Sequence, residues 1–190
     1  MWILIVGMAV FLGVHSIAIA APGARARALR RFGAGRWKAG IAALSLAGLL
    51  LIIYGFQAAR SSHMQLYVYQ PAAWMRHVTL VLMLPVFPLV FAAYLPGRIK
   101  AAAKQPMLAG VKLWALAHLF SNGSLADLLL FGGFLGWAVL DFVSLQRRPR
   151  PVQAPPGRFN DALAVVLGLG VYGLTLGWAH LRLIGVAPLG

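Results

Sequence analysis

The strongest constraint on this chain is a series of six apolar segments of roughly membrane-crossing length. They occupy residues 2–21, 37–58, 74–95, 107–120, 126–145 and 161–183. A transmembrane helix needs about 20 mainly apolar residues, and the short fourth segment can span if the bilayer thins or if residues 104–106 extend it. The chain is 61% hydrophobic and 11% charged, against about 25% charged in a typical soluble domain. We therefore expect an all-α, polytopic membrane helix bundle of about six transmembrane helices, forming one domain over residues 1–190.

Basic residues gather in alternate connections between these segments. The first, third and fifth connections carry Arg25, Arg27, Arg30, Arg31, Arg36 and Lys38; then Arg98, Lys100 and Lys104; then Arg147, Arg148, Arg150 and Arg158. Basic loops face the cytoplasm, so we expect both termini outside a bacterial inner (cytoplasmic) membrane. The net charge of +14 then faces the cytoplasmic leaflet of the lipid bilayer, and no nucleic-acid partner is expected. No basic residue precedes the first segment, so we expect it to be retained rather than cleaved as a signal.

Local motifs refine this arrangement. Asn122-Gly123 is typical of a tight turn, and Ser124 followed by Asp127 has the form of a capping box. The fourth and fifth segments are therefore expected to form an antiparallel hairpin. We expect Asp161 to open the last helix and stabilise its N-terminus, and Asp141 to pair with Lys104.

Prolines and glycines interrupt several segments. Pro85 and Pro88 are expected to bend or break the third helix, either opening a cavity or helping the helices to pack. Two GxxxG pairs favour close helix contacts. They are Gly132/Gly136 and Gly173/Gly177.

Ionisable groups inside a bilayer are costly and are therefore candidates for function. Of the five histidines, His15 and His118 lie among apolar neighbours, and we expect His63 to be solvated in an outer loop. Two imidazoles are fewer ligands than zinc usually takes, and the chain has no cysteine. Haem accepts two axial imidazoles and an apolar surrounding, so the residues favour haem over zinc. The alternative is that each is an ordinary buried histidine that has its hydrogen bonds.

Depth in the membrane leaves the second ligand open. At about 1.5 Å per residue, His118 lies about 17 Å from the inner end of its segment and His15 about 9 Å from the inner end of its own. His77 and His180 lie nearer the level of His118 and remain alternative ligands. Lys112 either extends its ammonium group towards the cytoplasm or binds a haem propionate, and so counts as a cofactor-binding candidate.

The segment QPMLAGVKLWALAHLFSNGSLADLLLFGGFLGWAV and the N-terminal FLGVHS resemble the signature of the NnrU family of bacterial membrane proteins, over nearly the whole chain. The resemblance implies an association with nitrite and nitric oxide reduction. NnrU proteins also look related to 15-cis-zeta-carotene isomerase, which holds haem b with two histidines in motifs that match His15-Ser16 and Ala117-His118. One departure is Gln105, where the family commonly has histidine before proline. A weaker likeness to isoprenylcysteine methyltransferases lacks the Arg/Glu motif, because the chain has no Glu.

Three functions remain open at this point. The first is a haem-b-binding membrane protein accessory to nitrite and nitric oxide reduction (denitrification), with denitrification membrane enzymes as partners. The second is an enzyme, a haem-dependent cis-trans isomerase that takes an apolar, carotenoid-like polyene. The third is a structural membrane protein without a cofactor. In the haem interpretations His15 and His118 bind the iron.

Overall fold

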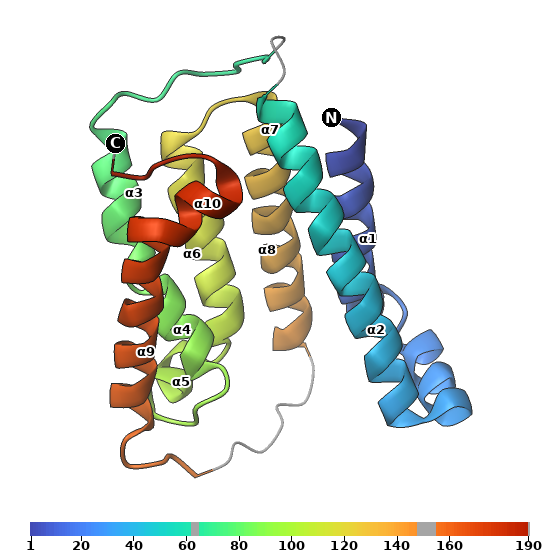
Figure 1. The fold of residues 1–190 in the computed structure, drawn as a ribbon. Coiled ribbons are helices and arrows are strands. Elements are labelled where there is room, and N and C mark those ends of the chain that lie inside the picture. The colour runs from blue at the N-terminus through green and yellow to red at the C-terminus, as the bar shows by residue number, and fades with distance from the viewer. Residues whose placement is uncertain (62–64, 148–154, 190) are drawn as a thin grey trace. The chain divides into compact units, whose positions relative to one another are not determined.

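The computed structural model describes residues 1–61, 65–147 and 155–189, in which the secondary structure is helical apart from one isolated β-bridge (Figure 1). The chain divides into two compact units, Met1–Leu66 and Tyr67–Gly190. His63, Arg148 and Arg150, for which a loop position was expected, lie outside the described residues. Each unit is an assembly of helices in its own right.

The first unit is a helical hairpin of α1 (Trp2–Ala20) and α2 (Pro22–Arg60). Glycines bring the two backbones together in antiparallel register. A Cβ atom added to Gly7 would lie 2.6 Å from the Ile52 nitrogen, and one added to Gly48 would lie 2.8 Å from the Phe11 nitrogen. Gly55 meets the Leu4 backbone in the same way. Any larger side chain at these three positions would force the helices apart.

The arginine-rich stretch after α1 is helical, although the charge pattern predicted a connection. Pro22 occupies the first turn of α2, where its missing N–H costs nothing, and alanine and arginine are good helix formers. Gly33, with φ of 77° and ψ of 161°, interrupts the helix. Arg25, Arg27, Arg30 and Arg31 therefore lie on a short helical segment that ends at the Gly33 kink. Arg36 and Lys38 follow the kink in the longer part of α2.

The second unit contains ten helical elements among the described residues. They are α3 (Met75–Met83), α4 (Val86–Ala92), α5 (Arg98–Ala103), α6 (Pro106–Ser121), α7 (Leu125–Asp127), the π-helix η1 (Leu128–Gly132), α8 (Gly133–Gln146), α9 (Asn160–Leu174), the π-helix η2 (Thr175–Ala179) and α10 (His180–Ile184). Helix α6 packs against α3, α4 and α8, and α9 packs against α4. Helix α6 therefore has neighbours on several sides (Figure 1).

The expected break in the third segment is confirmed, since α3 ends at Met83 and α4 begins at Val86. The bend is filled by close packing. Gly168 of α9 lies so near Pro88 that a Cβ atom would overlap it, and Gly110 of α6 approaches the Val86 carbonyl. By contrast, the four GxxxG glycines have open space on their Cβ side, within 4 Å and among the described atoms. Within the described part of the second unit these four glycines therefore make no close helix contact.

The hairpin tip between α6 and α8 has the predicted capping box. Ser124 Oγ accepts a hydrogen bond from the Asp127 N–H at 3.2 Å, and Asp127 Oδ2 accepts from the Ser124 N–H at 3.0 Å. The segment preceding α3 covers this tip: Val68 N–H donates to the Gly123 carbonyl, and the Tyr69 hydroxyl donates to the Asn122 carbonyl at 2.8 Å. The tip is thus held by the capping box at its own end of α7 and by the segment that precedes α3.

Asp161 has a second role beside the predicted one. It lies in the first turn of α9, and its carboxylate also accepts hydrogen bonds from the backbone N–H groups of Arg98 and Ile99 at 2.9 and 3.0 Å. N–H groups in the first turn of a helix have no partner within the helix, and a carboxylate at a helix N-terminus is favourable. The side chain therefore ties α5 to α9.

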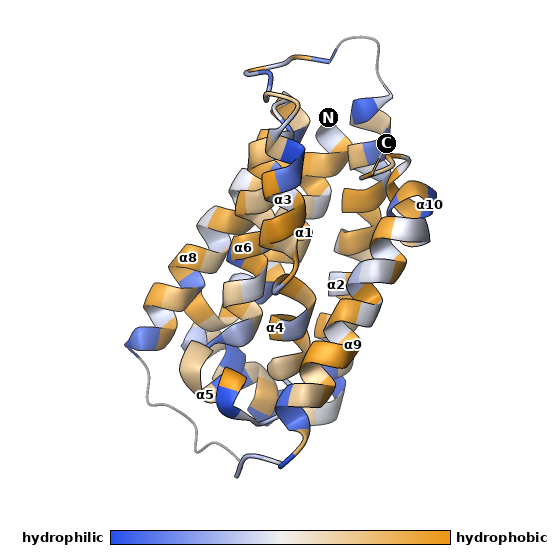
Figure 2. Ribbon diagram, turned by 90° about the vertical axis from the view of Figure 1, so that its left-hand side faces the viewer, coloured by the Kyte–Doolittle hydropathy of each residue, from blue (hydrophilic) through white to orange (hydrophobic). Residues whose placement is uncertain are grey.

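Five helical segments are long and apolar enough to cross a membrane: Trp2–Ala20, Pro22–Arg60, Met75–Ala92, Leu125–Gln146 and Asn160–Ile184. Helix α6, at 16 residues, is about 24 Å long and falls short of that length. Hydrophobic residues run along the length of the longer helices, and hydrophilic residues gather near their ends and around α5 (Figure 2). The chain is therefore a lipid-embedded, all-α membrane protein.

Candidate functional site

His118 lies on α6 within a group of aromatic rings that we call the aromatic cluster, formed by Trp114, Phe131 and Phe134. The His118 and Phe131 rings stack, with centroids 4.6 Å apart and planes 25° apart. Trp114 contacts His118 at 5.5 Å and meets both phenylalanines edge-on. The imidazole is half-buried and fixed against an apolar surface, as the sequence predicted.

The orientation of His118 follows from one hydrogen bond. Its Nδ1 lies 2.9 Å from the Trp114 carbonyl oxygen, four residues earlier on the same helix. A carbonyl oxygen only accepts, so Nδ1 carries the proton and Nε2 of the neutral ring presents its lone pair. Metal-binding histidines are commonly held in this way through the other ring nitrogen.

A second imidazole lies next to His118. The ring centroids of His118 and His180 are 6.4 Å apart, and their planes differ by 18°. His180 Nδ1 donates to the Val186 carbonyl at 2.7 Å, so its Nε2 also presents a lone pair. The rise per residue along the helices predicted that these two histidines lie at similar depth, and the structure brings them together.

Both π-helices adjoin this site. Phe131, which stacks on His118, belongs to η1, and η2 ends one residue before His180. π-Helical turns are rare and occur frequently at functional sites. At the start of η2 the Thr175 hydroxyl donates to the Val171 carbonyl at 2.8 Å, competing with the regular backbone pattern. No simple sequence pattern signals a π-turn, which is why this feature was missed.

His15 lies in the unit Met1–Leu66, half-buried on α1. Its Nδ1 donates to the Phe11 carbonyl at 2.7 Å, and its ring stacks on Phe11 with centroids 4.4 Å apart. Like His118, His15 is therefore held by a hydrogen bond from Nδ1 to the carbonyl four residues earlier on its own helix. The pairing of His15 with His118 stays a prediction.

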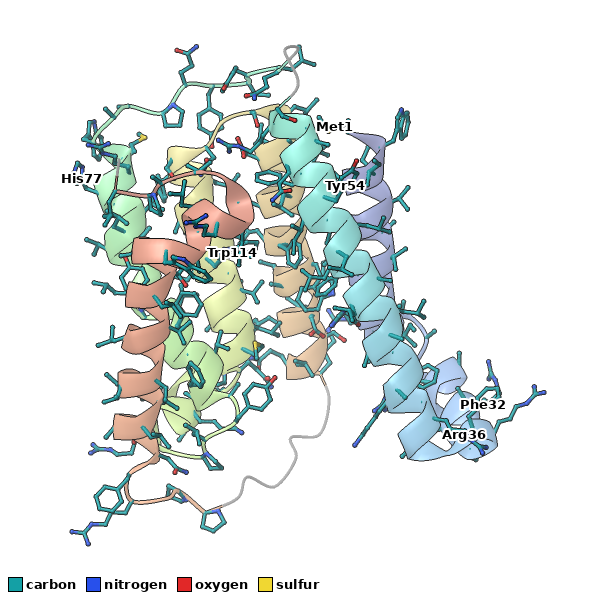
Figure 3. The ribbon with its side chains drawn as sticks, viewed as in Figure 1. Met1, Phe32, Arg36, Tyr54, His77 and Trp114 are labelled. Carbon is teal, nitrogen blue, oxygen red and sulfur yellow. The ribbon has the colours of Figure 1, made fainter. Side chains whose placement is uncertain are left out.

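His77, the other alternative ligand, is exposed near the start of α3, whereas Trp114 lies among the helices of the unit (Figure 3). Its Nδ1 makes a long contact of 3.3 Å with the Trp74 carbonyl. This position makes His77 the weakest of the candidate ligands.

Lys112 has an aromatic partner in the structure. Its Nζ lies 4.0 Å from the centroid of the Phe142 ring on α8, a cation–π contact that partly compensates for burying the charge. Lys112 is six residues closer to the N-terminus of α6 than His118. The propionate role stays a prediction, as does the ion pair of Asp141 with Lys104.

Gln105 precedes α6 as its N-cap residue and forms no capping hydrogen bond through its side chain. The position lies at the opposite end of α6 from His118. Gln105 is therefore not part of the His118 site.

Among the described residues no group of three or more His, Cys, Asp or Glu side chains could hold a metal ion. Structural zinc sites usually use four such ligands and catalytic ones three. A pair of neutral imidazoles in an apolar setting suits haem, which supplies four equatorial nitrogens itself and needs only axial ligands. The donor set at His118 therefore fits haem better than a bare metal ion.

Comparison with known proteins gives one family. The family model described as NnrU protein matches residues 3–188, nearly the whole chain. No curated protein and no solved structure matches the chain.

Proposed function

We propose, since this chain belongs to the NnrU family, that it is an integral membrane protein that binds haem b, with His118 as one axial ligand. The observation that carries the proposal is the fixed orientation of His118. Its Nδ1–H is bound to the Trp114 carbonyl at 2.9 Å, and its ring packs on Phe131. Nε2 is therefore available to iron within apolar surroundings.

The second axial ligand has two candidates. The family resemblance implies His15, whose Nδ1 is held by the Phe11 carbonyl, and the geometry of the second unit favours His180. A neutral imidazole at either position avoids the cost of placing a charge in the membrane, which is at least ~2.5 kcal/mol. Lys112 is the residue that we assign to a haem propionate, because its ammonium group lies on the same helix as His118.

Haem b supplies one-electron chemistry when it is bound. The role that the family resemblance favours is accessory to nitrite and nitric oxide reduction in the bacterial inner membrane. His118 and the aromatic cluster would hold the cofactor and exclude water from it. The partners in this role are membrane enzymes of denitrification.

An absorption spectrum of the purified protein from haem-sufficient cells tests the cofactor. We expect a low-spin haem b spectrum that His118→Ala abolishes and His77→Ala preserves, since His77 is exposed. A colourless wild-type protein would instead support a structural protein without cofactor.

The biological role needs a separate experiment. A denitrifying strain that lacks its own copy of this protein is complemented with the wild-type chain or with His118→Ala, and nitrite and nitric oxide consumption are measured. We expect only the wild-type chain to restore consumption. Equal restoration by both, together with haem-dependent isomerisation of a carotenoid-like polyene by the purified protein, would favour the isomerase.

We also propose that α6 completes six membrane spans and that both termini lie outside. Support comes from the basic residues at 22–38, 98–104 and 147–158, which alternate with connections that carry few charges. The short α6 spans by locally thinning the bilayer.

A further inference from the structure

We infer that His180, rather than His15, is the second axial ligand and that it binds the same iron as His118. The inference rests on the proposed function, because the ion in question is the haem iron. It adds a residue outside both motifs on which the family resemblance is based. Three independent features of the structure support it.

The first feature is the spacing of the two rings. Bonds from metal to imidazole nitrogen are about 2.0 to 2.1 Å long, so two imidazoles on opposite sides of one ion have ring centres about 6 Å apart. The observed separation between His118 and His180 is 6.4 Å, with nearly parallel planes. The separation of the two ring centres therefore matches that of two imidazoles bound to one metal ion.

The second feature is the way in which His180 is oriented. Gly185 ends α10 with φ of 81°, a left-handed conformation that favours glycine. The chain then turns back so that the Val186 carbonyl accepts the His180 Nδ1–H at 2.7 Å. As at His118, this hydrogen bond fixes the tautomer that keeps Nε2 unprotonated. The C-terminal turn thus serves as the support that a metal-binding histidine needs.

The third feature is the π-helix η2. A π-turn contains one more residue than an α-helical turn, and each residue of an α-helix advances by about 100°. The extra residue in Thr175–Ala179 therefore changes the side of the helix from which His180 projects by roughly that angle. A regular helix through residues 160–184 would direct the imidazole elsewhere. The π-turn therefore helps to direct His180 towards His118.

Substitution of single histidines by methionine tests the assignment in the haem-loaded, full-length protein. A methionine that replaces one of two axial histidines keeps a six-coordinate iron and raises its reduction potential. We expect His180→Met to stay low-spin with a higher midpoint potential. His15→Met and the exposed control His77→Met are expected to leave the potential unchanged. The measurement is a spectroscopic redox titration.

If His180→Met does not retain haem, His180→Ala is reconstituted with haem in the presence of free imidazole. Recovery of the low-spin spectrum supports the inference, because added imidazole replaces the missing ligand, and a lack of recovery overturns it. A raised potential in His15→Met together with no change in His180→Met also overturns it and leaves the proposed function intact. A wild-type protein that binds no haem overturns both.

Discussion

The Tyr172 hydroxyl of α9 donates a hydrogen bond to the Leu80 carbonyl of α3, 2.7 Å away. Pro85 creates the need for this bond. Pro85 has no N–H to donate to the Val81 carbonyl. The Leu84 N–H donates to that carbonyl instead, at 3.2 Å. The Leu80 carbonyl, which the Leu84 N–H would bond in a regular helix, is then left without its backbone partner. An unpaired carbonyl is costly in lipid, so Tyr172 both satisfies the break and joins α9 to α3.

Removing the Tyr172 hydroxyl should therefore destabilise the second unit. We expect Tyr172→Phe to lower the free energy of unfolding by about 0.6 to 1.7 kcal/mol, between the average and the largest value found for side-chain hydrogen bonds in a membrane protein. Unfolding in mixed micelles measures the change. Tyr54→Phe is the matched control, because Tyr54 is exposed on α2, and equal effects of the two variants would contradict this account.

Lys112 offers a second test, in which charge and packing can be separated. We expect Lys112→Met to lower the haem content of the purified protein without reducing its expression, because a propionate would lose its partner. The measurement is the ratio of haem to protein.

The matched control is Phe142→Leu, which removes the ring below the Lys112 ammonium group and keeps the charge. We expect Phe142→Leu to retain haem. If both variants keep their full haem content, Lys112 does not bind a propionate. Its roles are then the contact with Phe142 and the extension of its ammonium group towards the cytoplasm.

Reporter fusions test the number of spans. With six spans, a reporter after Gln146, at the end of α8, is expected in the cytoplasm, and one at the C-terminus in the periplasm. If α6 does not cross the membrane, both locations are reversed while the N-terminus stays outside. The two patterns are opposite, so the fusions distinguish five spans from six.

Tyr69 predicts a pH dependence outside the membrane. Burial, with a smaller contribution from the Asp127 carboxylate, raises the pKa of Tyr69 above its ordinary value of 10.0. The neutral phenol donates to the Asn122 carbonyl, and a phenolate has no proton to donate. The stability from this contact is therefore complete below pH 10 and is lost as the pH rises through the raised pKa. Limited proteolysis near residues 67–70 should accelerate there, and Tyr69→Phe should abolish the pH dependence.

Much of the fold follows from local sequence signals. The bounds expected for the first, fourth, fifth and sixth segments agree with the observed helices to within one or two residues, because apolar runs in lipid must be helical. The capping box at Ser124 and the break at Pro85 were also predicted, since each depends on residues within one turn. The helix that follows the Gly33 kink begins close to the start expected for the second segment, residue 37, whereas the basic stretch before Gly33 is helical although its charge indicates a loop.

The arrangement around His118 was less predictable. Helical periodicity gives the depth of a residue and its side of an ideal helix, but a π-turn shifts every later side chain. The proximity of His118 and His180 depends on η2 and on the glycine turn after α10. Phe131 likewise reaches His118 from η1. No residue spacing in the sequence encodes these contacts directly.

The glycine-mediated contacts show the same limit. GxxxG spacing pointed to four glycines that lie in open space, whereas Gly7, Gly48 and Gly55 make the close contacts. Gly48 and Gly55 are seven residues apart on one face of α2, a spacing that could have indicated them. Spacing alone does not reveal which face of a helix meets a partner.

The tight packing of Gly7, Gly48 and Gly55 has a consequence for biogenesis. The whole α1–α2 interface lies within the first 66 residues, so this hairpin can assemble in the bilayer while the rest of the chain is still being translated. N-terminal units commonly fold first during synthesis, and helices that are already inserted associate through close packing in lipid. A bulky residue at Gly55 would therefore act on nascent chains, lowering the yield of inserted protein before any later helix has left the ribosome.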